Sequence, residues 1–194
     1  MSTCAEAWAG DFGNQYVQRN RVDWRARIPF WRGVLDRTGA RSVYEVGCNS
    51  GWNLSAIRKA DADVSTHGHD VNYGAVLQAR SAGLDVVHAE RWPEDAFLYS
   101  VDLSFTAGVL IHIAPKELRS MMQQIVGTSA DYVLAVEYAA DKEEEVLYRG
   151  QTGMLWRRPY GRLYQDMGLT LVDEWDAGPS FDRCQAWLLR RGSP

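Results

Sequence analysis

The sequence predicts an α/β domain built on a mostly parallel β-sheet. Between residues 42 and 138, short β-prone segments alternate with segments of helical periodicity, which is the pattern of βαβ units. The last two strand-like segments, 169–176 and 183–191, have no helix between them, which indicates an antiparallel edge. The chain has 194 residues, enough for one domain with a real core.

The first helix of the domain is expected over residues 27–40. Pro29 should begin or kink it, and Gly39 lies where it should end. Its apolar residues recur at helical spacing: Ile28, Trp31, Val34 and Leu35.

The alternation then starts with a strand over 41–47 and a helix over 52–60. A second strand over 63–70 is expected although its apolar content is low. A helix over 73–83, ended by Gly83, leads to a strand over 84–90.

The next strand, 102–110, runs into a turn at Gly108. The segment 114–127 predicts a helix with a continuous apolar face. Pro115 lies near its start and Gly127 just past its expected end. The strand over 131–138 is strongly apolar, which is typical of burial on both faces of a sheet.

Composition narrows the function classes. A formal charge of -4 and a pI near 5.6 argue against nucleic acid as the main partner. No apolar run reaches the roughly 18 to 20 residues that span a bilayer. The N-terminus has no secretion-signal pattern, and the odd, widely spaced Cys4, Cys48 and Cys184 indicate reduced thiols. These features favour a cytoplasmic protein; the oligomeric state stays undetermined.

No metal site is expected. His67 and His69 share one face of a strand and Asp70 follows, but a third convergent ligand is missing.

The segment "YEVGCNSGWN", residues 44–53, forms the first strand-to-helix turn, where open α/β sheets bind their ligands. A dinucleotide loop would place a glycine where Asn49 stands, and Glu45 would repel a pyrophosphate. The carboxylate suits a ligand with an ammonium group, such as S-adenosylmethionine. Asn49 tolerates left-handed backbone angles, so it can replace the glycine. An ordinary tight turn is the alternative.

A second acidic residue lies at the spacing of a ribose-binding carboxylate. Asp70 comes 19 residues after Gly51, at the expected end of the second strand. The third strand ends in His88, Ala89 and Glu90, where a polar side chain can approach an adenine amino group. Together with the glycine turn, these residues predict a cofactor site.

The segments "YEVGCNSGWN", "GHDVN" and "DLSFTAGVLIHIAP" resemble the class I S-adenosylmethionine-dependent methyltransferases. "WAGDFGNQYVQRN" and "YRG" extend the resemblance to the methylases associated with pseudaminic acid biosynthesis. The resemblance implies a Rossmann-like, seven-stranded sheet with a C-terminal antiparallel hairpin. It also implies methyl transfer from S-adenosylmethionine to a small acceptor, with S-adenosylhomocysteine as the product.

The resemblance divides the chain into an N-terminal cap with the first helix, 1–38, and a core, 39–194. The cap would include Phe12. Its aromatic residues at four-residue spacing indicate either a packed helix or a lid with hinges at Gly10 and Gly13. The expected cofactor-binding residues are Tyr16, Arg19, Asn20, Glu45, Gly47, Cys48, Asn49, Gly51, Asp70, Val71, Asn72, Ala89, Glu90, Gly108 and Val109.

Catalysis and acceptor binding are assigned to a second group. His112 is the expected general base because an unperturbed imidazole titrates near neutral pH, although it can instead pack against the next helix. Glu137, at the end of a strand, is the other catalytic candidate. The acceptor is expected to contact Tyr138, Tyr148, Arg149 and Arg157.

The leading functional hypothesis is methyl transfer to a hydroxyl or amine of a sugar-like, nucleotide-like or secondary-metabolite acceptor. A nicotinamide-dependent reductase with a degenerate glycine loop is one rival. A Rossmann-like binding module without catalysis is the other.

Overall fold

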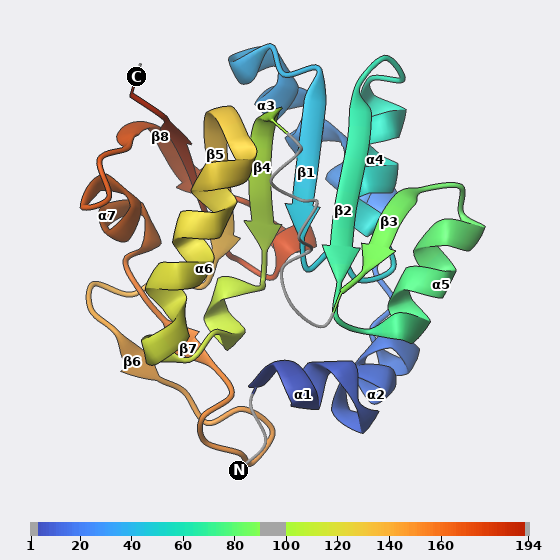
Figure 1. Ribbon diagram of the computed structural model, residues 1–194, viewed down its shortest axis with the longest axis vertical. Helices are drawn as coiled ribbons and strands as arrows, with labels where there is room; N and C mark the ends of the chain where they lie inside the picture. The colour runs from blue at the N-terminus through green and yellow to red at the C-terminus, as the bar shows by residue number, and fades with distance from the viewer. Residues whose placement is uncertain (1–3, 90–99, 193–194) are drawn as a thin grey trace.

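The computed structural model describes residues 4–89 and 100–192, and a seven-stranded sheet is its main feature (Figure 1). The strand order is β3-β2-β1-β4-β5-β9-β8. The first five strands pair in parallel, whereas β9 runs antiparallel to both β5 and β8. This confirms the predicted mostly parallel sheet with an antiparallel C-terminal hairpin. The strands are β1 (Ser42–Val46), β2 (Ser65–Asp70), β3 (Asp85–His88), β4 (Val101–Ala107), β5 (Ser129–Glu137), β8 (Thr170–Asp176) and β9 (Gln185–Arg190).

Helices cover both faces of the sheet. In Figure 1, α6 and α7 lie on the viewer's side, and α3 and α4 lie behind the sheet. The helices are α1 (Cys4–Ala9), α2 (Asp11–Arg19), α3 (Ile28–Thr38), α4 (Trp52–Ala60), α5 (Tyr73–Ser81), α6 (Pro115–Thr128) and α7 (Tyr160–Gln165). Short 3-10 helices are η1 (Trp24–Arg27), η3 (Leu110–His112) and η4 (Pro179–Phe181), and a small separate sheet pairs β6 (Glu144–Glu145) with β7 (Trp156–Arg157).

The core consists of two apolar layers separated by the sheet. Because side chains alternate along a strand, Leu134 and Val136 of β5 belong to the layer under α3 and α4, and Val133 and Ala135 to the layer under α6 and α7. This two-sided burial explains why the β5 segment is apolar at successive positions.

The helix and strand predictions agree well with the structure. Gly39 and Gly83 follow α3 and α5 with φ of 66° and 77°, the left-handed conformation that ends helices. One boundary was wrong, because α6 continues through Gly127 to Thr128. β6, β7 and most of α7 were not predicted, because these elements are too short to show periodicity in the sequence.

The polar strand β2 lies inside the sheet because its polar side chains have partners on neighbouring strands. The Tyr44 hydroxyl of β1 and the His69 Nδ1 atom are 3.0 Å apart, and His67 Nδ1 lies 2.7 Å from a carboxylate oxygen of Asp85 in β3. Satisfied polar groups therefore replace the apolar contacts that a buried strand usually makes.

The N-terminal helices α1 and α2 lie across the carboxyl ends of the central strands (Figure 1). The Asn72 side-chain amide donates to the Trp8 carbonyl oxygen and to Asn14 Oδ1, and thereby holds both helices to the start of α5. Gly13, expected as one possible hinge, lies inside α2, where an added Cβ would stand 1.8 Å from the Trp8 carbonyl oxygen. The absence of a side chain at Gly13 therefore permits this close contact between the helices.

Candidate active site

The glycine turn after β1 has the backbone conformation that the sequence predicted. Gly47, Asn49 and Gly51 have φ of 68°, 49° and 76°. Asparagine therefore occupies a left-handed position where a dinucleotide loop would have glycine. A Cβ at Gly47 would stand 2.6 Å from a Val109 methyl group, so this glycine also permits the turn after β1 to approach the turn after β4.

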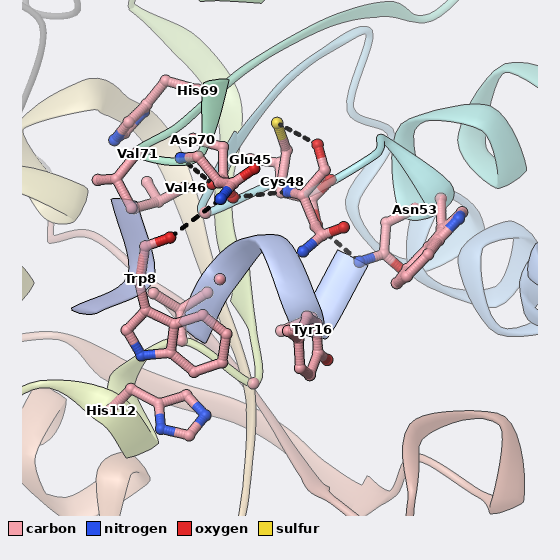
Figure 2. A pocket seen from close by; sticks show the side chains of 18 of the residues that line it. Trp8, Tyr16, Glu45, Val46, Cys48, Asn53, His69, Asp70, Val71 and His112 are labelled. Carbon is pink, nitrogen blue, oxygen red and sulfur yellow. Dashed lines mark hydrogen bonds between the residues drawn. The ribbon is translucent and has the colours of Figure 1, made fainter. Parts of the chain in front are cut away.

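A cavity opens between these turns and the N-terminal helices, and we call it the first cavity (Figure 2). It lies at the carboxyl ends of β1, β2 and β4, the edge where parallel sheets bind ligands. Most predicted cofactor residues line it: Tyr16, Asn20, Glu45, Gly47, Cys48, Asn49, Asp70, Val71, Asn72, Gly108 and Val109.

Glu45 places a buried carboxylate in the first cavity. Its Oε1 atom accepts a 2.6 Å hydrogen bond from the Asn53 side-chain amide, whereas its Oε2 atom is buried and has no partner among the described residues. Burial raises the pKa of Glu45 to about 8, against the opposing effects of Asn53 and Arg27. A buried carboxylate oxygen without a donor is costly, and a cationic ligand group would satisfy it.

Arg27 and Asn53 extend this site beyond the residues that the sequence analysis named. Arg27 Nη1 donates to Asn53 Oδ1 at 2.9 Å, and Asn53 in turn holds Glu45. The link brings η1, α4 and β1 together around the cavity. No local sequence signal marks Arg27, because only the fold brings it to Asn53.

Asp70 ends β2 and fixes two turns at the cavity wall. One oxygen accepts from the Asn49 backbone N–H and the other from the Asn72 N–H, both at 2.7 Å. Burial raises the pKa of Asp70, while the backbone N–H groups of Asn72, Asn49 and Val71 lower it. A carboxylate has about four lone-pair sites, so Asp70 can still accept from a ligand hydroxyl at the cavity.

Glu137 is placed differently from the catalytic role that the sequence suggested. It is fully buried at the end of β5, and it accepts hydrogen bonds from the backbone N–H groups of Val109, Leu110 and Ile111 at 3.1–3.3 Å. Burial raises its pKa to about 7, against the effect of these donors. The carboxylate caps η3 and orients the turn after β4, so we assign it a positioning role.

His112 ends η3 beside an aromatic cluster. Its ring centroid lies 4.6 Å from that of Trp8 and 5.3 Å from that of Tyr148, and Phe12 and Tyr16 pack against Trp8 (Figure 2). Its Nδ1 atom lies 2.6 Å from the Met154 carbonyl oxygen, which can only accept, so Nδ1 carries the proton. Nε2 is then the basic atom.

Burial changes the titration expected for this imidazole. It lowers the pKa of His112 to about 4, so the side chain is neutral at pH 7. The near-neutral titration inferred from the sequence is therefore wrong for the folded protein. A neutral His112 can still accept a hydrogen bond at Nε2, and its contact with Met154 gives it a structural role as well.

A second cavity adjoins the first, and both are lined by Gly108 and His112 and by the cap residues Tyr16 and Asn20. Three of the residues expected to bind the acceptor line it: Tyr138, Tyr148 and Arg149. Arg19, predicted to bind the cofactor, lies here rather than in the first cavity.

Three other predictions differ from this arrangement. Arg157 pairs with Glu144 in the small sheet and lies outside the residues that line the two cavities, so an acceptor contact has no support there. Gly51 and Ala89 are not among the residues that line the two cavities. An added Cβ at Gly51 would stand 2.2 Å from a Leu84 methyl carbon, and Ala89 donates its backbone N–H to the Asp70 carbonyl oxygen. Glu90 lies outside the described residues.

Within residues 4–89 and 100–192, no three His, Cys, Asp or Glu side chains gather as a metal-binding group. In the same part of the chain, no helix combines the length and apolar character that crossing a lipid bilayer requires.

Solved structures share this architecture. The magnesium protoporphyrin IX methyltransferase of Synechocystis PCC 6803, with S-adenosylhomocysteine bound, matches 97% of this chain and 98% of its own, with a TM-score of 0.72 and 13% identity. The 1,6-didemethyltoxoflavin-N1-methyltransferase of Burkholderia thailandensis matches 94% and 84%, with a TM-score of 0.68 and 15% identity. The chain has the class I methyltransferase fold.

A third similar structure is the sugar N-methyltransferase KedS8 from Streptoalloteichus sp ATCC 53650, which matches 95% of this chain and 94% of its own at 14% identity, with a TM-score of 0.67. No family model and no curated protein matches the sequence. The narrower resemblance to the pseudaminic-acid-associated methylases therefore depends on the motif residues alone.

The positioning role of Glu137 predicts a particular mutational pattern. Glu137→Ala should lower the free energy of unfolding by on the order of 3 kcal/mol, because it leaves buried backbone donors without an acceptor. Glu137→Gln keeps an acceptor oxygen for Val109 and Leu110 and should cost less. Urea unfolding measures both. A Gln variant of native stability that has lost all turnover would instead assign Glu137 to the chemistry.

The buried state of His112 predicts a pH-dependent stability. Because folding lowers its pKa from 6.5 to about 4, the unfolded chain binds the proton more tightly, and stability should rise with pH across this interval. The rise amounts to on the order of 3 kcal/mol from His112, and the similarly lowered pKa of His69 adds a second contribution. Urea unfolding should show that His112→Gln removes its own share. An unchanged slope in this variant contradicts the assigned burial.

Proposed function

We propose that the protein is an S-adenosylmethionine-dependent methyltransferase that acts on a hydroxyl or amine of a small acceptor. The observation that carries this proposal is the unpaired, buried Oε2 atom of Glu45 in the first cavity. Such an oxygen fits the ammonium group of the cofactor's methionine part. The fold supports the proposal, because similar structures contain S-adenosylmethionine or S-adenosylhomocysteine.

The residues around the cavity fit the other parts of this cofactor. Asp70 offers acceptor oxygens for ribose hydroxyls, and Val71 offers an apolar wall beside it. Arg27 supplies a cation near Glu45 for the cofactor's carboxylate. When bound, S-adenosylmethionine supplies a sulfonium methyl group that is open to nucleophilic displacement. The protein's contribution is alignment of the acceptor, and proton acceptance at His112 Nε2 if the acceptor is a hydroxyl.

The nicotinamide-dependent rival fits the site less well than the methyltransferase. A nicotinamide dinucleotide would bring its pyrophosphate to the turn beside the buried carboxylates Glu45 and Asp70. A binding module without catalysis has the same cofactor site, so turnover is the measurement that distinguishes it.

The acceptor is proposed at the level of a class. Two similar structures are N-methyltransferases, acting on 1,6-didemethyltoxoflavin and on a sugar, and another is a mitomycin 7-O-methyltransferase. A sugar-like, nucleotide-like or secondary-metabolite acceptor is consistent with these and with the pseudaminic-acid resemblance. The buried free thiols Cys48 and Cys184 are consistent with a cytoplasmic location. We further propose that residues 1–38 cap a catalytic core formed by 39–194.

Ligand-induced stabilisation tests the proposal. S-adenosylhomocysteine at about 100 times its Kd should stabilise the fold by about 2.7 kcal/mol and raise the melting temperature, whereas NADH should not. Thermal unfolding with each ligand measures the difference. Stabilisation by NADH alone would replace the methyltransferase with a reductase.

Glu45 should make cofactor binding pH-dependent. The free protein holds a proton on Glu45 up to about pH 8, and an ammonium group favours the ionised form. Binding therefore releases a proton, and affinity should strengthen by up to about tenfold per pH unit between pH 6 and 8 and then level off. Calorimetric titration in buffers of different ionisation enthalpy measures the released proton.

Matched variants identify the group that causes the pH dependence of binding. Glu45→Gln should weaken binding and remove most of the slope, leaving the part that Asp70 contributes. Glu117→Gln, which changes an exposed carboxylate on α6, serves as the control. An affinity independent of pH in the unmodified protein contradicts an ammonium contact at Glu45.

A further inference from the structure

The two cavities differ in the charge of the side chains that line them. Glu45, Asp70 and Arg27 line the first cavity, so carboxyl groups outnumber basic side chains there. The ionisable Asp and Arg side chains that line the second cavity are Arg19, Arg27, Arg149 and Asp182. Three cations and one carboxylate make the second cavity basic in a protein whose formal charge is -4.

The carboxylate of the second cavity is already engaged. Asp182 accepts a short hydrogen bond from the Tyr138 hydroxyl, and both residues line the cavity wall. Two acidic residues of the 139–147 segment have partners of their own: Glu143 pairs with Arg158, and Glu145 accepts from the Gly153 backbone N–H. Asp182 keeps its charge in its contact with Tyr138, but it is one carboxylate against three arginines, so the second cavity retains an excess of positive charge.

Arg19 and Arg149 have no ion-pair or hydrogen-bond partner in the described part of the chain. Arg19 lies 5.4 Å and 5.5 Å from the ring centroids of Phe12 and Tyr16, and Arg149 lies 5.8 Å from that of Tyr148. Stacking on aromatic rings orients a guanidinium group without using its N–H donors. Both arginines therefore keep their donors available for an anion.

Backbone conformation also distinguishes the second cavity. Among the described residues, four non-glycine residues have positive φ: Asn49, Arg149, Asp182 and Arg183. Asn49 lines the first cavity, Arg149 and Asp182 line the second, and Arg183 follows Asp182. Such conformations cost free energy and concentrate at functional sites. The chain thus accepts strain where it presents Arg149 and Asp182 to the second cavity.

We propose that the second cavity binds an acceptor that carries a carboxylate or phosphate group, held by Arg149 and Arg19. This inference rests on the proposed function, because it identifies the second cavity as the acceptor site. With the anion at the outer arginines, the rest of the acceptor extends toward Gly108 and His112, which line both cavities. The anionic group is a recognition element, and the methylated hydroxyl or amine is a separate part of the acceptor.

Matched probe pairs test the charge requirement. The protein is saturated with S-adenosylhomocysteine and titrated calorimetrically with glucuronate against glucuronamide, with 4-hydroxybenzoate against 4-hydroxybenzamide, and with glucose 6-phosphate against glucose. The anionic member of at least one pair should bind roughly tenfold or more tightly, because charge-assisted hydrogen bonds to arginine are lost in the neutral one. The carboxylate and phosphate pairs identify which anion is preferred.

Arginine variants show which side chains cause the preference for the anionic probe. Arg149→Gln and Arg19→Gln should each abolish the preference for the anion while S-adenosylhomocysteine still raises the melting temperature. Arg119→Gln, a change of an exposed arginine on α6, is the matched control and should retain the preference. Each arginine is exposed, so loss of the fold is not expected.

Two results would overturn the proposal. One is equal binding, or no binding, of both members of every pair to the S-adenosylhomocysteine-loaded protein. The other is a preference that survives in both the Arg149 and Arg19 variants. Failure of the proposed function is a separate observation, because S-adenosylhomocysteine would then not raise the melting temperature at all.

Discussion

Three buried carboxylates at the carboxyl edge of the parallel sheet determine the arrangement of the site. Glu45, Asp70 and Glu137 stand at the ends of β1, β2 and β5, with exposures of 1%, 8% and 0%, and burial raises the pKa of each. Asp70 and Glu137 accept backbone N–H groups of the adjacent turns and so shape the cavity wall. Asp70 and Glu137 therefore hold the turns at this edge, whereas Glu45 keeps one oxygen without a donor and can receive a ligand.

The fold was largely predictable because its main signals are local. Helical spacing marked α3 and α6, glycines in left-handed conformation marked the ends of α3 and α5, and the apolar run of β5 marked a strand buried on both faces. The polar strand β2 was the weak case. Its stability inside the sheet comes from cross-strand partners such as Tyr44, which no window of the β2 sequence contains.

The residues of the candidate site could be predicted only where their position follows from their spacing to the glycines of one turn. Glu45, Asn49 and Asp70 were found because spacing from the glycines places them at the carboxyl edge. Arg27, Asn53 and Trp8 were missed as site residues because tertiary contacts bring them there. Glu137 was expected at this edge, but its contacts with the turn after β4 were not, since its three backbone partners lie 26 to 28 residues away in the chain.

The meeting of the two cavities explains why a neutral imidazole is suitable at His112. Under the proposed function, the carboxyl groups of the first cavity would hold a cationic cofactor, and the arginines of the second would hold an anionic acceptor. A permanent positive charge between them would repel a sulfonium, and a permanent negative charge would repel the acceptor. The tilted rings of Trp8 and Tyr148 lie against His112, its burial keeps its pKa low, and Nδ1 lies against the Met154 carbonyl oxygen. Through Trp8, the N-terminal helices thus contribute to the burial that keeps His112 uncharged between the two cavities.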